Sequence, residues 1–203
     1  MNEKEEINEE NSTKKILLSI ILITILVISV ISLSFATFQK EQNDRGSNSI
    51  TTQNISMNYT ENVNGISINN ALPMSDNVGK KLTGKGEYFD FTINTTIVGK
   101  STIMYEIAAI KDSSSTIPDS NIKLYLEQQI SGSYESVMEP KLFTPITTKS
   151  EIGSPKGSMI LKTVTKDKTS SDNYRLRMWI NESSSVGQEQ SYTVKINVYG
   201  KAQ

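Results

Sequence analysis

The chain has 203 residues with 21 Lys and Arg against 22 Asp and Glu, and it contains neither cysteine nor histidine. Without cysteine there are no disulfides or thiolate metal sites, and without histidine the usual general base and most zinc ligands are missing. We therefore expect no catalysis, metal or cofactor, and the near-neutral charge argues against a nucleic-acid partner.

The polar amino-terminal tail, residues 1–15, is followed by 24 uncharged residues from Ile16 to Gln39, most of them Ile, Leu or Val. A helix satisfies its own backbone hydrogen bonds in hydrocarbon, and a run of this length can cross a core of about 30 Å. We predict a transmembrane helix, or signal anchor, from Ile16 to Phe38 that holds the chain in the lipid bilayer. Lys14 and Lys15 directly precede it, so we expect the tail in the cytoplasm and the carboxyl-terminal domain outside the cell.

A cleavable signal peptide is the competing interpretation of the same segment. Ser34-Phe35-Ala36 has small residues where a signal peptidase requires them, so cleavage between Ala36 and Thr37 is chemically reasonable. The apolar stretch is longer than the usual signal-peptide core of about 7 to 15 residues, which favours the uncleaved anchor.

Residues 39–54 are polar and lack periodicity, which predicts a stalk, and we expect one extracellular domain over residues 55–203. Period-two alternation of apolar residues, typical of half-buried strands, recurs along this domain. The clearest stretches begin at Ile55, Ile66, Phe89, Ile103, Ile122, Met159, Tyr174 and Tyr192.

The proline- and glycine-containing region from Ser131 to Lys156 is expected to be mostly loop with short strands. No stretch of the domain has helical spacing over a dozen residues. The sequence therefore predicts an all-β fold: an antiparallel β-sandwich, Greek-key or jelly-roll-like, preceded by one amino-terminal transmembrane helix.

Arg175, Arg177 and Trp179 alternate with the apolar residues of their strand and form a stripe on its polar face. Such a stripe suits the surface binding of a polysaccharide or an anionic polymer. An ordinary solvated strand face with an Arg–Trp contact is the interpretation we favour.

Two short polar segments, Asp119-Ser120-Asn121 and Asp76-Asn77, offer oxygen atoms of the kind that calcium binds. Neither has the acidic spacing of a calcium loop, and Asp and Asn also form turns by bonding to their own backbone. We expect turns at both places.

Three stretches resemble a group of mostly uncharacterised single-pass, cysteine-free β-sandwich surface proteins of Gram-positive-type bacteria. They are Ile66–Asp76, Phe89–Asn94 and Tyr174–Ile180.

More distantly, the junction Phe35-Ala36-Thr37-Phe38 and the β-rich domain resemble the TasA/camelysin family of matrix-fibre subunits. That resemblance implies removal of a signal peptide and donation of the new amino-terminal segment, here Thr37 to Tyr59, to the next subunit's sheet. The long apolar helix departs from the family pattern, and no motif supports the peptidase activity of camelysin.

We therefore expect a membrane-anchored extracellular protein with a structural or adhesive role, without catalysis. Its partners would be the bilayer and either further copies of itself or other surface and matrix proteins. The alternatives are a fibre subunit processed after Ala36 and an extracellular ligand-sensing or inhibitory module.

Overall fold

The computed structural model describes residues 47–51, 55–61, 65–84, 86–185, 187 and 189–203. The predicted transmembrane helix from Ile16 to Phe38 and the alternative signal-peptidase site between Ala36 and Thr37 lie outside these residues. Within the described part of the chain, no helix has both the length and the apolar character needed to cross a membrane.

The described residues form mainly strands, with one short α-helix, α2 (Asp76–Gly79), and one 3₁₀ turn, η1 (Asp119–Asn121). The strands are β1 (Ser47–Thr51), β2 (Ile55–Glu61), β3 (Ile66–Asn69), β4 (Tyr88–Ile97), β5 (Ile103–Lys111), β6 (Ile122–Ile130), β7 (Ser133–Leu142), β8 (Ser158–Lys166), β9 (Ser170–Ile180) and β10 (Ser191–Ala202).

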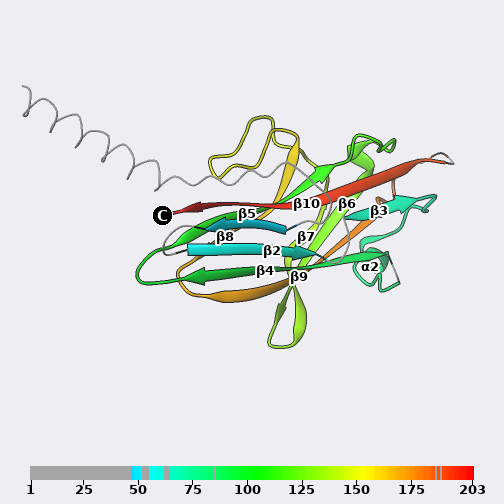
Figure 1. Cartoon of the computed structure of the whole chain (residues 1–203). Helices are drawn as coiled ribbons and strands as arrows, with labels where there is room; N and C mark the ends of the chain where they lie inside the picture. The colour runs from blue at the N-terminus through cyan, green and yellow to red at the C-terminus, as the bar shows by residue number, and fades with distance from the viewer. Residues whose placement is uncertain (1–46, 52–54, 62–64, 85, 186, 188) are drawn as a thin grey trace, which may run out of the picture. The chain divides into compact units, whose positions relative to one another are not determined.

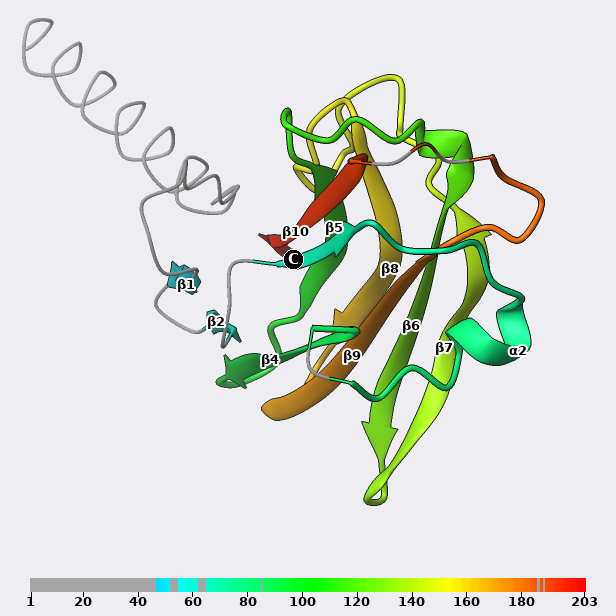
Figure 2. The same ribbon diagram turned by 90° about the vertical axis from the view of Figure 1, so that its right-hand side faces the viewer.

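These strands make two antiparallel sheets, so the predicted all-β class is confirmed. The six-stranded sheet has the order β1-β2-β4-β9-β6-β7, and the four-stranded sheet has the order β3-β10-β5-β8 (Figure 1). Apart from the β1–β2 and β6–β7 hairpins, every connection along the chain passes from one sheet to the other (Figure 2).

The core lies between the two sheets and is formed by the alternating residues that the sequence predicted to point inward. In β4, Phe89, Phe91 and Ile93 are all buried, and β2 and β10 show the same alternation. Phe91 is at the centre of an aromatic cluster, with ring centroids 5.6 Å from Tyr59 and 5.4 Å from Tyr174. Such ring pairs contribute roughly 0.5–1.5 kcal/mol each beyond the area that they bury.

A polar contact between the sheets lies within this core. The Tyr105 hydroxyl of β5 is 3.2 Å from the Tyr174 hydroxyl of β9, and both side chains are fully buried. Nearby, Lys166 of β8 donates to the carboxylate of Asp172 in β9 at 2.9 Å. Because each pair joins one sheet to the other, the contacts fix how the sheets are positioned relative to each other.

The region between β7 and β8 folds onto the outer face of the four-stranded sheet. Ser150 and Ser154 each donate a hydroxyl hydrogen bond of 2.6 Å to the buried Glu106 carboxylate of β5. The backbone amide of Ser154 donates in turn to the Ser150 hydroxyl at 2.8 Å. This explains how a buried carboxylate is tolerated there, since hydrogen bonds replace its lost hydration.

Two expectations need correction. Residues 133–142, expected to be mostly loop, form the edge strand β7, which tolerates Pro140 because an edge strand need not donate every backbone bond. Part of the expected stalk, Ser47–Thr51, is strand β1 and pairs with β2. The domain therefore begins before Ile55.

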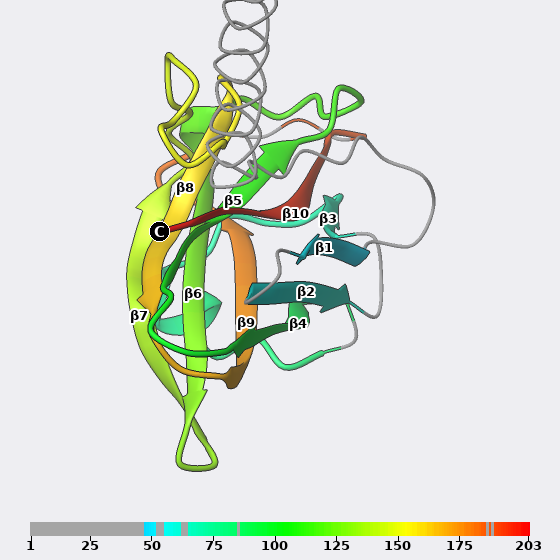
Figure 3. The same cartoon turned by 60° about the vertical axis from the view of Figure 1, so that its left-hand side comes forward.

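Strand β7 is irregular as well as polar. Its register against β6 shifts on both sides of Leu126, where Met138 is the partner. Hairpin β6–β7 turns at Ser131 and Gly132, which both have positive φ, of 51° and 91°. The hairpin extends past the ends of its neighbouring strands (Figure 3).

The buried tyrosines predict a loss of stability at alkaline pH. Burial raises the pKa of Tyr174 to about 12, and burial also raises the pKa of Tyr105 and Tyr192 above their usual range. A tyrosine whose pKa is raised by folding stabilises the fold fully at any pH below its unfolded-state pKa of about 10. That stabilisation is lost as the pH rises through the folded-state pKa. We expect the free energy of unfolding to fall between pH 10 and pH 12, as measured by urea titration.

The matched control is the double variant Tyr105→Phe, Tyr174→Phe, which removes two ionising groups but keeps their rings. Its free energy of unfolding should decline less steeply over the same pH range. Equal slopes for the two proteins would contradict the assignment.

Candidate functional site

The polar face of β9, on which Arg175, Arg177 and Trp179 lie, belongs to the outer surface of the six-stranded sheet. Their intervening neighbours Leu176 and Met178 point into the core. The predicted alternation is therefore confirmed for this strand. Another segment of the chain lies over one part of this outer face and leaves the other part open to solvent. We call these two parts the covered half and the open half.

The covered half lies under residues 74–82, which we call the cover segment and which include α2. Trp179 is 1% exposed, and Gly79 lies so close to its indole that a Cβ atom there would overlap the ring. Tyr125 of β6 packs edge-on against the same indole, with centroids 6.5 Å apart. The expected solvated face is therefore wrong for Trp179, because a segment distant in the sequence covers it.

Polar contacts hold the cover segment on the sheet. Its first residue, Met74, donates a backbone hydrogen bond of 3.0 Å to Ile180, and Asp76 accepts from Lys123 at 2.7 Å. Lys80 pairs with Glu139 of β7 and lies over the Tyr125 ring. The hydrogen bond between them raises the pKa of Lys80 and lowers that of Glu139.

Arg177 is also covered, with only 5% exposure, so the expected solvation is wrong here too. Its Nε donates a hydrogen bond of 2.7 Å to the Leu82 carbonyl at the end of the cover segment. Its Nη1 pairs with the buried Glu127 carboxylate. Burial lowers the pKa of Arg177, although a guanidinium remains charged in a protein. The Arg177–Glu127 pair is a structural ion pair inside the outer layer.

The open half begins at Arg175, whose side chain is 19% exposed and therefore contacts solvent. Asp90, directly opposite on β4, accepts two hydrogen bonds of 2.7 Å from its Nε and Nη2. The guanidinium carbon lies 4.1 Å from the centroid of Tyr88 and 4.2 Å from that of Tyr134. The hydrogen bonds to Asp90 raise the pKa of Arg175.

Next to this cluster runs a line of amide and hydroxyl groups across three strands. Thr92 donates to the Asn173 side-chain oxygen at 2.8 Å, and the Asn173 nitrogen donates to Gln129 at 3.0 Å. Gln129 pairs in register with Tyr134 in the extended part of the β6–β7 hairpin. The open half is therefore a polar, partly aromatic surface whose side chains hold one another in place.

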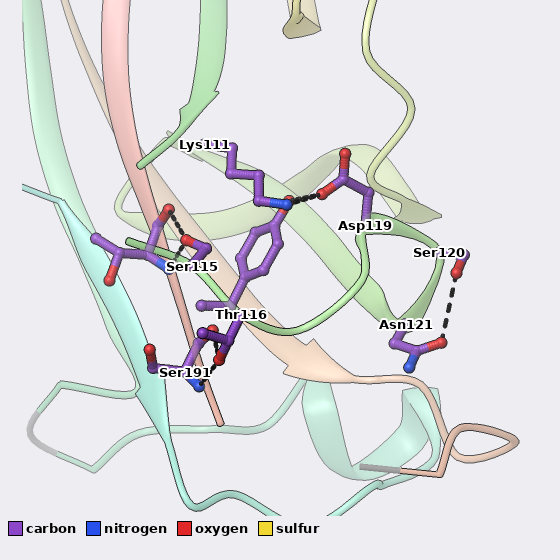
Figure 4. A network of polar contacts seen from close by, with 9 residues as sticks. Lys111, Ser115, Thr116, Asp119, Ser120, Asn121 and Ser191 are labelled. Atoms are coloured by element: carbon purple, nitrogen blue, oxygen red, sulfur yellow. Dashed lines mark hydrogen bonds and ion pairs between the residues drawn. The ribbon is translucent and has the colours of Figure 1, made fainter. Parts of the chain in front are cut away.

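The two segments considered for calcium have other roles. Asp119 accepts hydrogen bonds of 2.8 Å from Lys111 and 2.9 Å from the Tyr192 hydroxyl. These bonds belong to a network that joins the β5–β6 connection to β10 (Figure 4). Asp76 pairs with Lys123, as described above. Within the described ranges, no cluster of three or more acidic or other metal-ligating side chains is present.

Sequence reasoning identified Arg175 but missed the residues that surround it. Tyr88 and Asp90 could have been found from the sequence, because the alternation of β4 places both on its polar face. Tyr134 was hidden because its strand was expected to be loop. The cover segment had no periodic signal, since it is mostly irregular.

Comparison with known proteins gives no identification. No model of a known protein family matches the chain, and the curated proteins contain no match to it.

Gly79→Ala is predicted to destabilise the cover segment. The added methyl group would overlap the Trp179 ring, and overpacking of this kind costs about 1–3 kcal/mol. Urea unfolding followed by tryptophan fluorescence should show the loss, because Trp179 is the single tryptophan. Gly187→Ala is the control: its nearest neighbouring atom would be at 3.7 Å, and we expect no comparable effect.

Glu127→Leu is predicted to destabilise the fold by about 3–5 kcal/mol, because it leaves the buried Arg177 charge without its partner. Adding Arg177→Met should recover much of the lost stability, since it removes the unpaired charge. If the double variant were no more stable than Glu127→Leu alone, the pairing would not be the cause.

Proposed function

We propose that this chain is a single-pass protein of the bacterial cell membrane whose extracellular β domain has an adhesive or structural role. In this proposal residues 16–38 span the bilayer, residues 1–15 are cytoplasmic, and the domain lies outside the cell. The long apolar run and the two lysines before it support this arrangement.

One structural observation supports the adhesive role most directly: the open half of the outer face. Polar surface side chains are usually mobile, and ordering them on binding costs about 0.5–1.5 kcal/mol each. Around Arg175, these side chains are already held by Asp90, Tyr88 and Tyr134. A surface that is organised in advance and still contacts solvent is suited to recognition.

The pairing of the carboxylates supports a role without catalysis. Asp90, Glu127 and Asp172 each form an ion pair with a Lys or Arg side chain, and these pairs join elements of the fold. A general acid or base needs a free position beside a substrate, and these groups are engaged with their partners.

The finer fold assignment is part of the same proposal. We infer a Greek-key or jelly-roll-like sandwich, supported by the repeated passage of the chain between the two sheets. This arrangement places strands that are distant in sequence beside each other, as β4 and β9 are.

A processed fibre subunit is the second candidate, and one feature favours it. The expected donor segment, Thr37 to Tyr59, includes β1 and most of β2, which form one edge of the six-stranded sheet. Ile55, Met57 and Tyr59 of β2 fill the core. The same segment from a neighbouring copy would make the same contacts, so exchange between copies needs no new interface.

Intact mass and amino-terminal sequencing of protein from membranes and from culture medium distinguish the two candidates. The anchor predicts a full-length chain in the membrane fraction. The fibre subunit predicts a chain that begins at Thr37, found in the medium in high-mass assemblies. An Ala36→Leu variant provides the control, since it should block processing but leave an anchor unchanged.

The orientation is tested with an amine reagent that does not cross membranes. Lys149 and Lys156 are exposed on the domain, so we expect both to be labelled on intact cells. Lys14 and Lys15 should be labelled only after the cells are made permeable. Labelling of the second pair on intact cells would overturn the orientation.

A further inference from the structure

The open half, defined by Tyr88, Asp90, Thr92, Gln129, Tyr134, Asn173 and Arg175, has a further consequence for the choice of ligand. It spans β4, β9, β6 and β7, so its groups lie on neighbouring strands of one continuous sheet. Neighbouring strands are about 4.8 Å apart, and the groups therefore form a broad surface instead of a narrow pocket.

The charges of this surface cancel. The Arg175 guanidinium is neutralised by the Asp90 carboxylate through two hydrogen bonds, and Arg177, in the covered half, is paired with Glu127. An anionic polymer would have to compete with Asp90 for Arg175 and would be repelled by that carboxylate. Charge complementarity therefore favours a ligand without charge.

The uncharged groups of the surface are of two kinds. Tyr88 and Tyr134 contribute aromatic rings with an apolar face and a polar hydroxyl. Thr92, Asn173 and Gln129 contribute hydrogen-bond donors and acceptors, and Gln129 is exposed. A sugar matches this combination, because its hydroxyls both donate and accept while its C–H faces are apolar.

We propose that the open half binds a neutral polysaccharide, which packs on Tyr134 and Tyr88 and forms hydrogen bonds with Gln129, Asn173 and Thr92. This assignment deepens the proposed adhesive role and rests on it. The residues of the open half extend across several strands of the sheet, so they can contact successive sugar units of one polymer together. A protein partner would prefer a desolvated apolar pocket at the centre of its interface, which this polar surface does not supply.

Affinity electrophoresis of the full chain tests the proposal. The chain, held in a polyoxyethylene detergent that has no sugar head group, migrates in native gels containing dextran, galactomannan or mixed-linkage β-glucan. We expect at least one of these neutral polymers to retard it, and we expect alginate, an anionic polysaccharide, not to do so.

Variants then locate the binding surface. Tyr134→Ala should weaken the retardation about tenfold, Gln129→Ala should weaken it several-fold, and Tyr134→Phe should retain most of it because the ring remains. Thr163→Ala, at an exposed position on the outer strand of the four-stranded sheet, is the matched control and should bind like the parent chain. Unchanged Trp179 fluorescence verifies that each variant is folded.

Three outcomes would overturn the proposal: no retardation by any of the neutral polymers, retardation by alginate alone, or retardation that Tyr134→Ala and Gln129→Ala leave unchanged. None of them affects the labelling of Lys149 and Lys156 on intact cells. Failure of the polysaccharide assignment can thus be distinguished from failure of the proposed surface location.

Discussion

Closure of the cover segment over Trp179 is the contact on which the outer face of the six-stranded sheet depends. The stabilisation from an indole grows with the apolar area removed from water, and the sheet can exclude water from only one of its faces. Gly79 allows the second face to be closed, because its backbone approaches the ring where no side chain would fit. Part of the gain is offset, since the indole Nε1 has no hydrogen-bond partner among the described residues.

The two arginines of β9 show how burial separates structural from recognition roles. Arg175 and Arg177 are two residues apart and point to the same side, and each is paired with a carboxylate on a neighbouring strand. The cover segment shields one pair and leaves the other in contact with solvent. The Arg177–Glu127 pair, under the cover segment, holds that segment and the sheet together. The Arg175–Asp90 pair, outside it, orients the side chains of the open half.

The alternation of apolar and polar residues decided which parts of this structure could be predicted from the sequence. A strict period of two shows which residues share a face, so the inward residues of β2, β4, β9 and β10 were predictable, and so was the fold class. Alternation does not report what packs on the outer face. Trp179 was therefore expected in solvent, because residues 74–82 are about a hundred positions away from it and have no periodic pattern. Strand β7 was missed because Pro140 usually interrupts strands, and only its edge position makes it acceptable.

The edge formed by β7 has a consequence for how copies of this domain could associate. Pro140 lacks a backbone N–H, Glu135, Glu139 and Lys141 are exposed along the strand, and its register shifts bend the ladder. All three features hinder the addition of another strand at that side. The opposite edge ends in β1, without a proline within its five residues. Pairing of copies through the edges of this sheet is therefore expected only at the β1 side, where two copies that meet form a closed pair instead of a growing series.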